Sequence, residues 1–397
     1  MPEILSFFVV ILASLIFSEL FVRFHLPWVV ALIIGGMIIG PFGLDIFTPS
    51  DTLSFLGEIG LIFLMFMAGL QTRLSGISNF KSGTAVLAIL NGGLPFLAGF
   101  GIGLYFGYSI TASLLIGIIF ISSSVAVIIP SLQTYKFLRT RVGKSILTST
   151  VFEDIASLLL LSILLQKSAP LTSLPLPVFY VTLLVVLVAL RWFITKIRKF
   201  FAAEAKSGRD LFQLEVRSIL GILVGTVIAF QLLGLHSIIA GFFAGLVLSG
   251  TITSEELFNK LSVISYGIFI PIFFVVLGAN TNIGVFGEIS GLWVFTIVII
   301  LGSMLSKFIG GVIAGKLNGF SAREGALIGA ATIPQLSTTL AVGFSSVEAN
   351  ILGNEFIAVL VALSITTTFL SPIFIKYIAG KNAEKIQSIE ASVNAKG

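Results

Sequence analysis

The chain has no cysteine, and its charged residues and histidines are scarce. Without cysteine it can form no disulfide, no thiol nucleophile and no thiolate metal site. The two histidines, His25 and His236, are not part of any HExxH-type spacing, which argues against an intramembrane metalloenzyme. Charged residues make up only 10% of the 397 residues, against roughly 25% in soluble domains. Such a chain cannot present a wetted surface, so we expect it to lie in lipid.

Long apolar runs replace the missing charges. Hydrophobic residues make up 56% of the chain, and the mean hydropathy is +1.11. A membrane-spanning helix needs about 20 apolar residues, and runs of this length indicate helices because lipid requires closed hydrogen-bond ladders. The sequence therefore predicts an all-α polytopic membrane protein. We expect about thirteen spans, at 3–22, 27–44, 53–72, 83–106, 109–134, 143–166, 175–195, 214–233, 236–250, 258–282, 290–316, 323–344 and 353–379.

The positions of the basic residues predict an orientation. Lysine and arginine gather in or beside the loops that follow odd-numbered spans, and these loops should be cytoplasmic. The first residues, MPEILSFF, lack a basic region and a cleavage site, which favours a retained span over a signal peptide. We expect a multi-pass protein of the plasma membrane, with its N-terminus outside. Residues 380–397 should form a polar cytoplasmic tail behind the transmembrane domain, 1–379.

Three ionisable residues lie near the middle of predicted spans. Glu153 and Asp154 lie about eleven residues into span 143–166, and Lys307 lies at a similar depth in span 290–316. Ionisable groups at this depth are functional candidates because burying them is costly. An ammonium offsets part of that cost for one carboxylate, which leaves the other available to bind a proton or a cation. The alternative is an ion pair that only fixes helix packing.

Two spans contain polar, helix-breaking centres. Span 109–134 has three serines, Ser122 to Ser124, ahead of Pro130, and span 323–344 contains the segment Pro334 to Thr338. Proline removes a backbone donor, and freed carbonyls at membrane depth are tolerated where they line a site or cavity. Broken helices of this kind supply carbonyls and hydroxyls to ion sites in transporters. The supporting positions that we expect there are Pro130, Pro334, Gln335, Ser337 and Thr338.

The order of the spans predicts an internal repeat. Repeat one would cover about 1–166 and repeat two about 214–379, with 175–195 as a linker helix between them. This division makes each polar span the fifth of its half, and the linker inverts the second half relative to the first. We therefore predict two inverted six-helix repeats, each with one discontinuous helix.

These features resemble the monovalent cation:proton antiporter superfamily, most closely its thirteen-span sodium/proton antiporters. The resemblance rests on HLPWVVALIIGGMIIGPFGL, LGEIGLIFLMFMAGLQTRL, SSSVAVIIPSLQ, the acidic pair and the SKFIGG lysine, in this order along nearly the whole chain. It implies a homodimer, a mobile six-helix core at about 83–166 and 290–379, and two crossed broken helices beside an ion-binding aspartate.

The same resemblance implies roles for individual residues. Asp154 matches the ion-binding aspartate, Glu153 the second acid, and Lys307 the lysine that pairs with it. Ser123 and Ser124 match polar residues of the first broken helix. Two departures stand out: the second acid is glutamate, one methylene longer than aspartate, and Pro334 to Ser337 replace an arginine and a glutamate found in many relatives.

The predicted function is antiport of a monovalent cation, Na⁺ or Li⁺, against protons, with cation and proton competing for Asp154. No cofactor and no nucleic acid partner is expected; the partners are the ions, lipid and a second copy. A K⁺/proton antiporter of the same fold stays open. From another class, a sodium-coupled organic-anion symporter or a passive cation channel remain alternatives. Electrogenic and electroneutral exchange both stay open, and Glu58 is either part of an outer funnel or a solvated helix-end residue.

Overall fold

The computed structural model describes residues 3–22, 27–71, 82–138, 140–168, 214–232, 237–249 and 255–379, together with six isolated residues between 178 and 192. This part of the chain is helical and contains no strand. Its contacts divide it into two compact units. The first unit is Met1–Phe24, Ala31–Ser78 and Ser162–Thr281, and the second unit is His25–Val30, Asn79–Leu161 and Asn282–Gly397.

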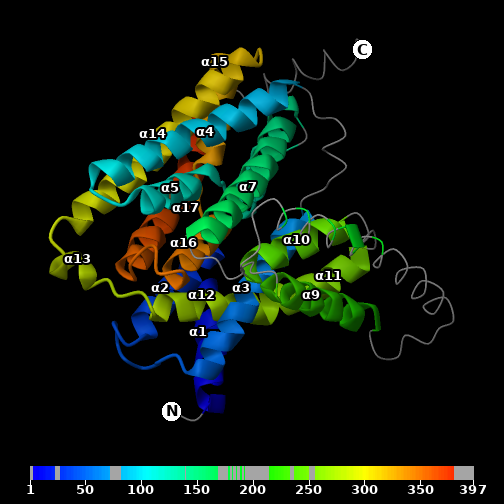
Figure 1. Ribbon diagram of the computed structural model, residues 1–397, viewed down its shortest axis with the longest axis vertical. Helices are drawn as coiled ribbons and strands as arrows, with labels where there is room; N and C mark the ends of the chain where they lie inside the picture. The colour runs from blue at the N-terminus through cyan, green and yellow to red at the C-terminus, as the bar shows by residue number, and fades with distance from the viewer. Residues whose placement is uncertain are drawn as a thin grey trace. The chain divides into compact units, whose positions relative to one another are not determined.

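The first unit is built around α3, which packs against α10 and α12 (Figure 1). Close packing of α3 on α10 depends on two glycines: a Cβ at Gly69 would lie 2.2 Å from the Phe242 carbonyl oxygen, and one at Gly245 would lie 2.1 Å from that of Phe66. The helices of this unit are α1 (Glu3–Val22), α2 (Trp28–Ile39, from Ala31 on), α3 (Asp51–Gln71), α9 (Leu214–Leu232), α10 (Ser237–Ser249), α11 (Glu255–Ile264), the π-helix η2 (Ser265–Phe269) and α12 (Ile270–Ala279).

The second unit is built around α14, which lies beside α4 and α15 (Figure 1). Helix α7 belongs to this unit up to Leu161, and its last turns belong to the first unit. The helices of the second unit are α4 (Ser82–Tyr105), α5 (Ile110–Ile121), α6 (Val125–Thr134), α7 (Arg141–Ser168), α13 (Val285–Glu288), α14 (Leu292–Leu317), α15 (Ala322–Thr332), α16 (Ser337–Glu348) and α17 (Glu355–Ala379).

The predicted spans and the observed helices agree closely over the described residues, with one clear difference. Helix α2 ends at Ile39, whereas the apolar run predicts a span to residue 44. Pro41 has no N–H to continue the ladder, and the chain turns so that the Leu44 N–H donates to the Ile38 carbonyl at 2.8 Å. The linker helix 175–195, apart from isolated residues, and the tail 380–397 lie outside the described residues. The count of thirteen spans and the inverted repeat remain predictions.

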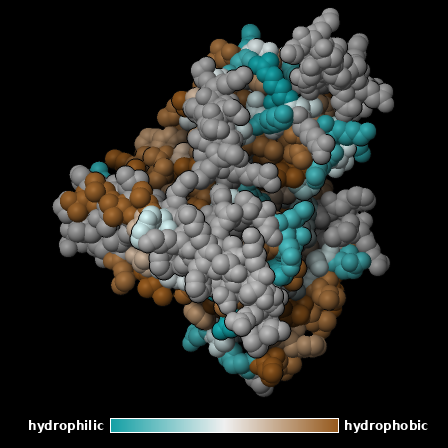
Figure 2. All heavy atoms as spheres, turned by 90° about the vertical axis from the view of Figure 1, so that its right-hand side faces the viewer, coloured by the Kyte–Doolittle hydropathy of each residue, from teal (hydrophilic) through white to brown (hydrophobic). Residues whose placement is uncertain are grey.

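Helix α14 shows how a span divides its surface between lipid and protein. Its outward stripe repeats every four residues and consists of large apolar side chains that are 41–58% exposed: Trp293, Ile297, Leu301, Leu305, Ile309 and Ile313. Its opposite face buries Ser303, Lys307, Gly310, Gly311 and Ala314. Figure 2 shows hydrophobic residues exposed on the surface beside hydrophilic ones. Because water would penalise so much exposed apolar surface, these faces fit a lipid environment, and the chain is a multi-pass membrane protein.

We expect Gly311→Ala to destabilise the second unit by about 1–3 kcal/mol, as overpacking substitutions do. A Cβ at Gly311 would lie 2.3 Å from the backbone nitrogen and Cα of Gly329, so α14 and α15 would have to separate. Thermal unfolding of the purified protein in detergent measures the effect. Gly101→Ala is the control, because a Cβ there meets nothing within 4 Å; equal melting temperatures for the two variants would contradict the prediction.

Candidate functional site at the crossing of two broken helices

The first break separates α5 from α6 at Ser122 to Ser124. The backbone is extended at Ser122 (φ −69°, ψ 158°) and at Ser124 (φ −83°, ψ 102°). Serine hydroxyls offer the backbone local alternatives to helical hydrogen bonds, and three in succession favour a break. Pro130 was expected to support this break, but it lies inside α6 and the helix continues past it to Thr134. The serines, and not the proline, therefore mark the interruption.

The second break separates α15 from α16, which are bent by 44°. Pro334 and Gln335 lie within it and Ser337 opens α16, as the sequence predicts. The two breaks meet: the Ser124 N–H donates to the Pro334 carbonyl at 2.7 Å, and the hydroxyls of Ser122 and Thr339 lie 2.9 Å apart. Freed backbone groups of one broken helix are thus satisfied by the other.

The C-terminal end of α5 points its free carbonyls at this crossing. The last four carbonyls of a helix have no partner within the helix. Here each of these carbonyls accepts a hydrogen bond from a side chain. The donors are Ser157 to Ile118 (3.1 Å), Ser122 to Ile119 (3.5 Å), Gln335 to Phe120 (3.3 Å) and Lys307 to Ile121. The Gln335 amide also donates to the Ser303 hydroxyl on α14 at 2.8 Å. The helix end is therefore a fixed array of oxygen atoms.

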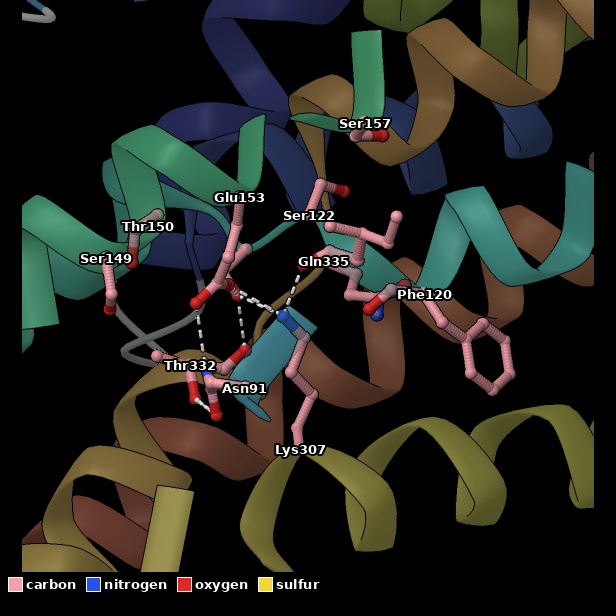
Figure 3. Close-up of polar contacts among 12 residues, drawn as sticks. Asn91, Phe120, Ser122, Ser149, Thr150, Glu153, Ser157, Lys307, Thr332 and Gln335 are labelled. Atoms are coloured by element: carbon pink, nitrogen blue, oxygen red, sulfur yellow. Dashed lines mark hydrogen bonds and ion pairs between the residues drawn. The ribbon is translucent and has the colours of Figure 1, made fainter. Parts of the chain in front are cut away.

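Lys307 and Glu153 form a fully buried ion pair beside this array. The Lys307 Nζ lies 2.8 Å from Glu153 Oε2, and both side chains are 0% exposed. Lys307 also donates to the Ser123 hydroxyl at 2.9 Å, and that hydroxyl lies 2.9 Å from Glu153 Oε2. Figure 3 shows Lys307 of α14 pointing at Glu153 of α7. The extra methylene of glutamate therefore does not prevent the pairing.

Asn91 completes the surroundings of Glu153, and the sequence analysis missed it. Its Nδ2 donates to Glu153 Oε1 at 2.8 Å, and its Oδ1 accepts from the Thr332 hydroxyl at 3.3 Å. Figure 3 shows the three side chains in a row. A signal was present: Asn91 is an amide in the apolar segment AILNGGLPF of a predicted span, where an unpaired polar group is costly.

Asp154 lies on the adjacent position of α7 and has a different environment. Its side chain is 7% exposed, and its Oδ1 has no hydrogen-bond partner among the described residues. The Thr338 side chain and the Ser123 backbone amide lie beside the carboxyl group. The Ser124 hydroxyl is also buried without a described partner. Buried oxygens without donors suit a hard cation, which prefers oxygen ligands.

Comparison with known families shows to which family this chain belongs. The family model described as "Sodium/hydrogen exchanger, transmembrane" matches residues 6–380. The chain belongs to the sodium/hydrogen exchanger family. This family consists of transporters and not enzymes, and its members need no cofactor.

Individual relatives of this exchanger cover almost its full length. It is 34% identical over 380 residues to a probable Na⁺/H⁺ antiporter 3 of Methanocaldococcus jannaschii, covering 94% of this chain and 95% of the relative. It is 29% identical to a Na⁺/H⁺ antiporter of Enterococcus hirae, covering 94% and 97%. The solved structure of the sodium proton antiporter MjNhaP1 from Methanocaldococcus jannaschii at pH 8 matches with a TM-score of 0.71 at 17% identity, covering 96% of this chain and 100% of that one. That likeness shows the fold.

Proposed function

We propose that this exchanger transports Na⁺ against protons by alternating access, with both ions competing for Asp154. The observation that carries the proposal is that two adjacent carboxyl groups have different partners. Glu153 is neutralised by Lys307, whereas Asp154 keeps one oxygen without a described partner. A buried carboxylate that has no cation bound to it is costly, so Asp154 is more stable when it holds either a proton or a cation.

The surroundings of Asp154 supply ligands for a dehydrated cation. The ligands would be the Asp154 carboxylate and the hydroxyls of Ser124 and Thr338, which come from the two broken helices. The Ser123 backbone N–H is a donor and stabilises the carboxylate instead. Oxygen ligands of this kind suit Na⁺ and Li⁺. Among the described residues no group of three His, Cys, Asp or Glu side chains could hold a metal ion. The proposed cation site has a single carboxylate, that of Asp154.

Transport then requires the site to open to each side in turn. We assign the mobile core to about 83–166 and 290–379, the segments that carry Asp154, Glu153 and Lys307. The remaining helices would form the scaffold of a homodimer in the plasma membrane, and lipid would surround the dimer. The N-terminus of each protomer would lie outside and its C-terminus in the cytoplasm. Backbone contacts at glycines within the second unit keep its helices together while it moves.

Other functions of this site make different demands. A K⁺/proton antiporter would use the same carboxylate, and only the size of the ligand cage would differ. A passive cation channel is disfavoured because the buried Lys307 ammonium at the crossing would repel cations from an open pore. A sodium-coupled organic-anion symporter would need a wider cavity for its second substrate than the closely bonded crossing provides.

In proteoliposomes, we expect added Na⁺ to drive protons across the membrane, and the apparent Km for Na⁺ to fall as the pH rises. The reason is competition: each proton removed from Asp154 makes the carboxylate available to Na⁺. A pH-sensitive dye inside the vesicles measures the proton movement at several Na⁺, Li⁺ and K⁺ concentrations.

The control is the same assay with choline as the added cation. A preference for K⁺ over Na⁺ would favour the K⁺/proton alternative. A Km for Na⁺ that does not change with pH would contradict competition at one carboxyl group. A proton gradient that drives ²²Na⁺ uptake against its own gradient separates an exchanger from a channel.

A further inference from the structure

The two carboxylate oxygens of Glu153 accept hydrogen bonds from different residues. Lys307 and the Ser123 hydroxyl lie at Oε2, at 2.8 and 2.9 Å. Among the described contacts, Asn91 is the donor to Oε1, at 2.8 Å. The carboxylate is therefore held from both sides, and Asn91 fixes its rotation about the last side-chain bond. A charge-assisted hydrogen bond of this kind is about twice as strong as a neutral one.

Asn91 is itself held in place by its neighbours. It is 0% exposed, and Thr332 occupies its other polar atom at 3.3 Å. A Cβ at Gly310, one turn after Lys307, would lie 3.3 Å from the Asn91 Cα, so the backbones of α4 and α14 nearly touch there. A Cβ at Gly92 would lie 3.6 Å from Glu153 Cγ. The backbone that carries Asn91 therefore cannot move away from the ion pair without separating these helices.

Two carboxyl groups, those of Glu153 and Asp154, are possible ion-pair partners of Lys307. It bonds Glu153, and Asp154 on the next residue also lies within its electrostatic reach. If Glu153 turned away, the ammonium would pair with Asp154 and would compete there with an incoming cation. The position of Glu153 therefore decides whether Asp154 is available.

We propose that Asn91 is a positioning residue that holds Glu153 against Lys307, keeps the ammonium away from Asp154, and so sets the apparent affinity for the transported cation. This inference rests on the proposed function, because it assumes that the cation binds at Asp154. It assigns to α4, which has no charged residue, a part in the exchange cycle.

The test is Asn91→Leu, which keeps the branched shape of the side chain, puts two methyl groups in place of its oxygen and nitrogen, and removes its donor. We expect the apparent Km for Na⁺ to rise about tenfold, the scale of one hydrogen bond to a charged group, with the maximal rate changed far less. Asn91→Asp replaces the donor by an acceptor of the same shape and should raise Km at least as far. Thr296→Val is the matched control, since its buried hydroxyl bonds only the Leu292 carbonyl of its own helix in the described contacts.

A second measurement separates positioning from a merely structural role. In a Lys307→Met background there is no ammonium to compete at Asp154, so adding Asn91→Leu should leave cation affinity unchanged. The Na⁺-dependent rise of the unfolding temperature of purified protein reports that affinity without requiring transport. A Km for Na⁺ in Asn91→Leu equal to that of the wild type would overturn the inference, as would an equal loss of affinity with and without Lys307. Wild-type protein that shows no Na⁺-dependent proton movement would instead refute the proposed function.

Discussion

Asp154→Asn is expected to reduce Na⁺-dependent proton movement to the level of protein-free liposomes while leaving a folded protein. The amide has nearly the shape of the carboxyl group, so the packing of this 7% exposed side chain is retained. It cannot carry a negative charge, and it therefore neither attracts a cation nor exchanges a proton. Because the mutation removes a buried carboxylate that has an unpartnered oxygen, it should not lower the unfolding temperature.

The control for Asp154→Asn is the same change at Asp51, an exposed residue in the first turn of α3. Asp51→Asn should keep exchange, with at most a small loss of stability from the helix dipole. Dye-based proton movement and thermal unfolding are measured on both variants. Full exchange by Asp154→Asn would show that the ions bind elsewhere, and aggregation of that variant alone would show that Asp154 has a structural role.

The helices could be predicted because lipid leaves so few alternatives. A run of about 20 apolar residues has to be a helix at membrane depth, so the gaps between charges predicted the ends of most of the described spans. Asp154, Glu153 and Lys307 stood out for the same reason, since an ionisable residue in a span is rare. Charge compensation predicts that Lys307 pairs with one of the two carboxyl groups, but only the family resemblance identifies Glu153 as that partner, because burial cost alone does not distinguish two adjacent acids.

Three local features could not be predicted from apolar runs and proline. Helix α2 ends at Ile39 because of a turn through Pro41, and the position of such a turn cannot be predicted from hydropathy. The break of the fifth span follows the serines and leaves Pro130 inside α6, since hydroxyls compete with the helix and one missing N–H does not stop it. Asn91 is neutral, so the pattern of charged residues does not indicate it, although its hydrogen bond to Glu153 is as short as the ion pair.

Lys307→Ala is expected to lower the free energy of unfolding by about 3–5 kcal/mol, the usual cost of breaking a buried ion pair from one side. Glu153 would remain 1% exposed with only neutral donors, Asn91 and Ser123, in contact with its carboxylate. The freed Ile121 carbonyl at the end of α5 would add to the loss. Thermal or chemical unfolding of purified protein in detergent measures the change, against the double variant Lys307→Leu with Glu153→Leu, which removes both charges and should recover much of the stability.

A second ion pair in the same chain supplies the comparison. Lys260 and Glu256 on α11 lie 2.7 Å apart, as close as Lys307 and Glu153, but their side chains are 34% and 76% exposed. Lys260→Ala should therefore cost less than about 1 kcal/mol, because water replaces the lost partner. Distance is nearly the same in the two pairs, so burial, together with the further bonds of Lys307 to Ile121 and Ser123, accounts for the expected difference. If the two alanine variants unfolded at the same temperature, Lys307 would not be compensating a buried charge, and the argument that Glu153 is neutralised so that Asp154 can exchange its ions would lose its physical basis.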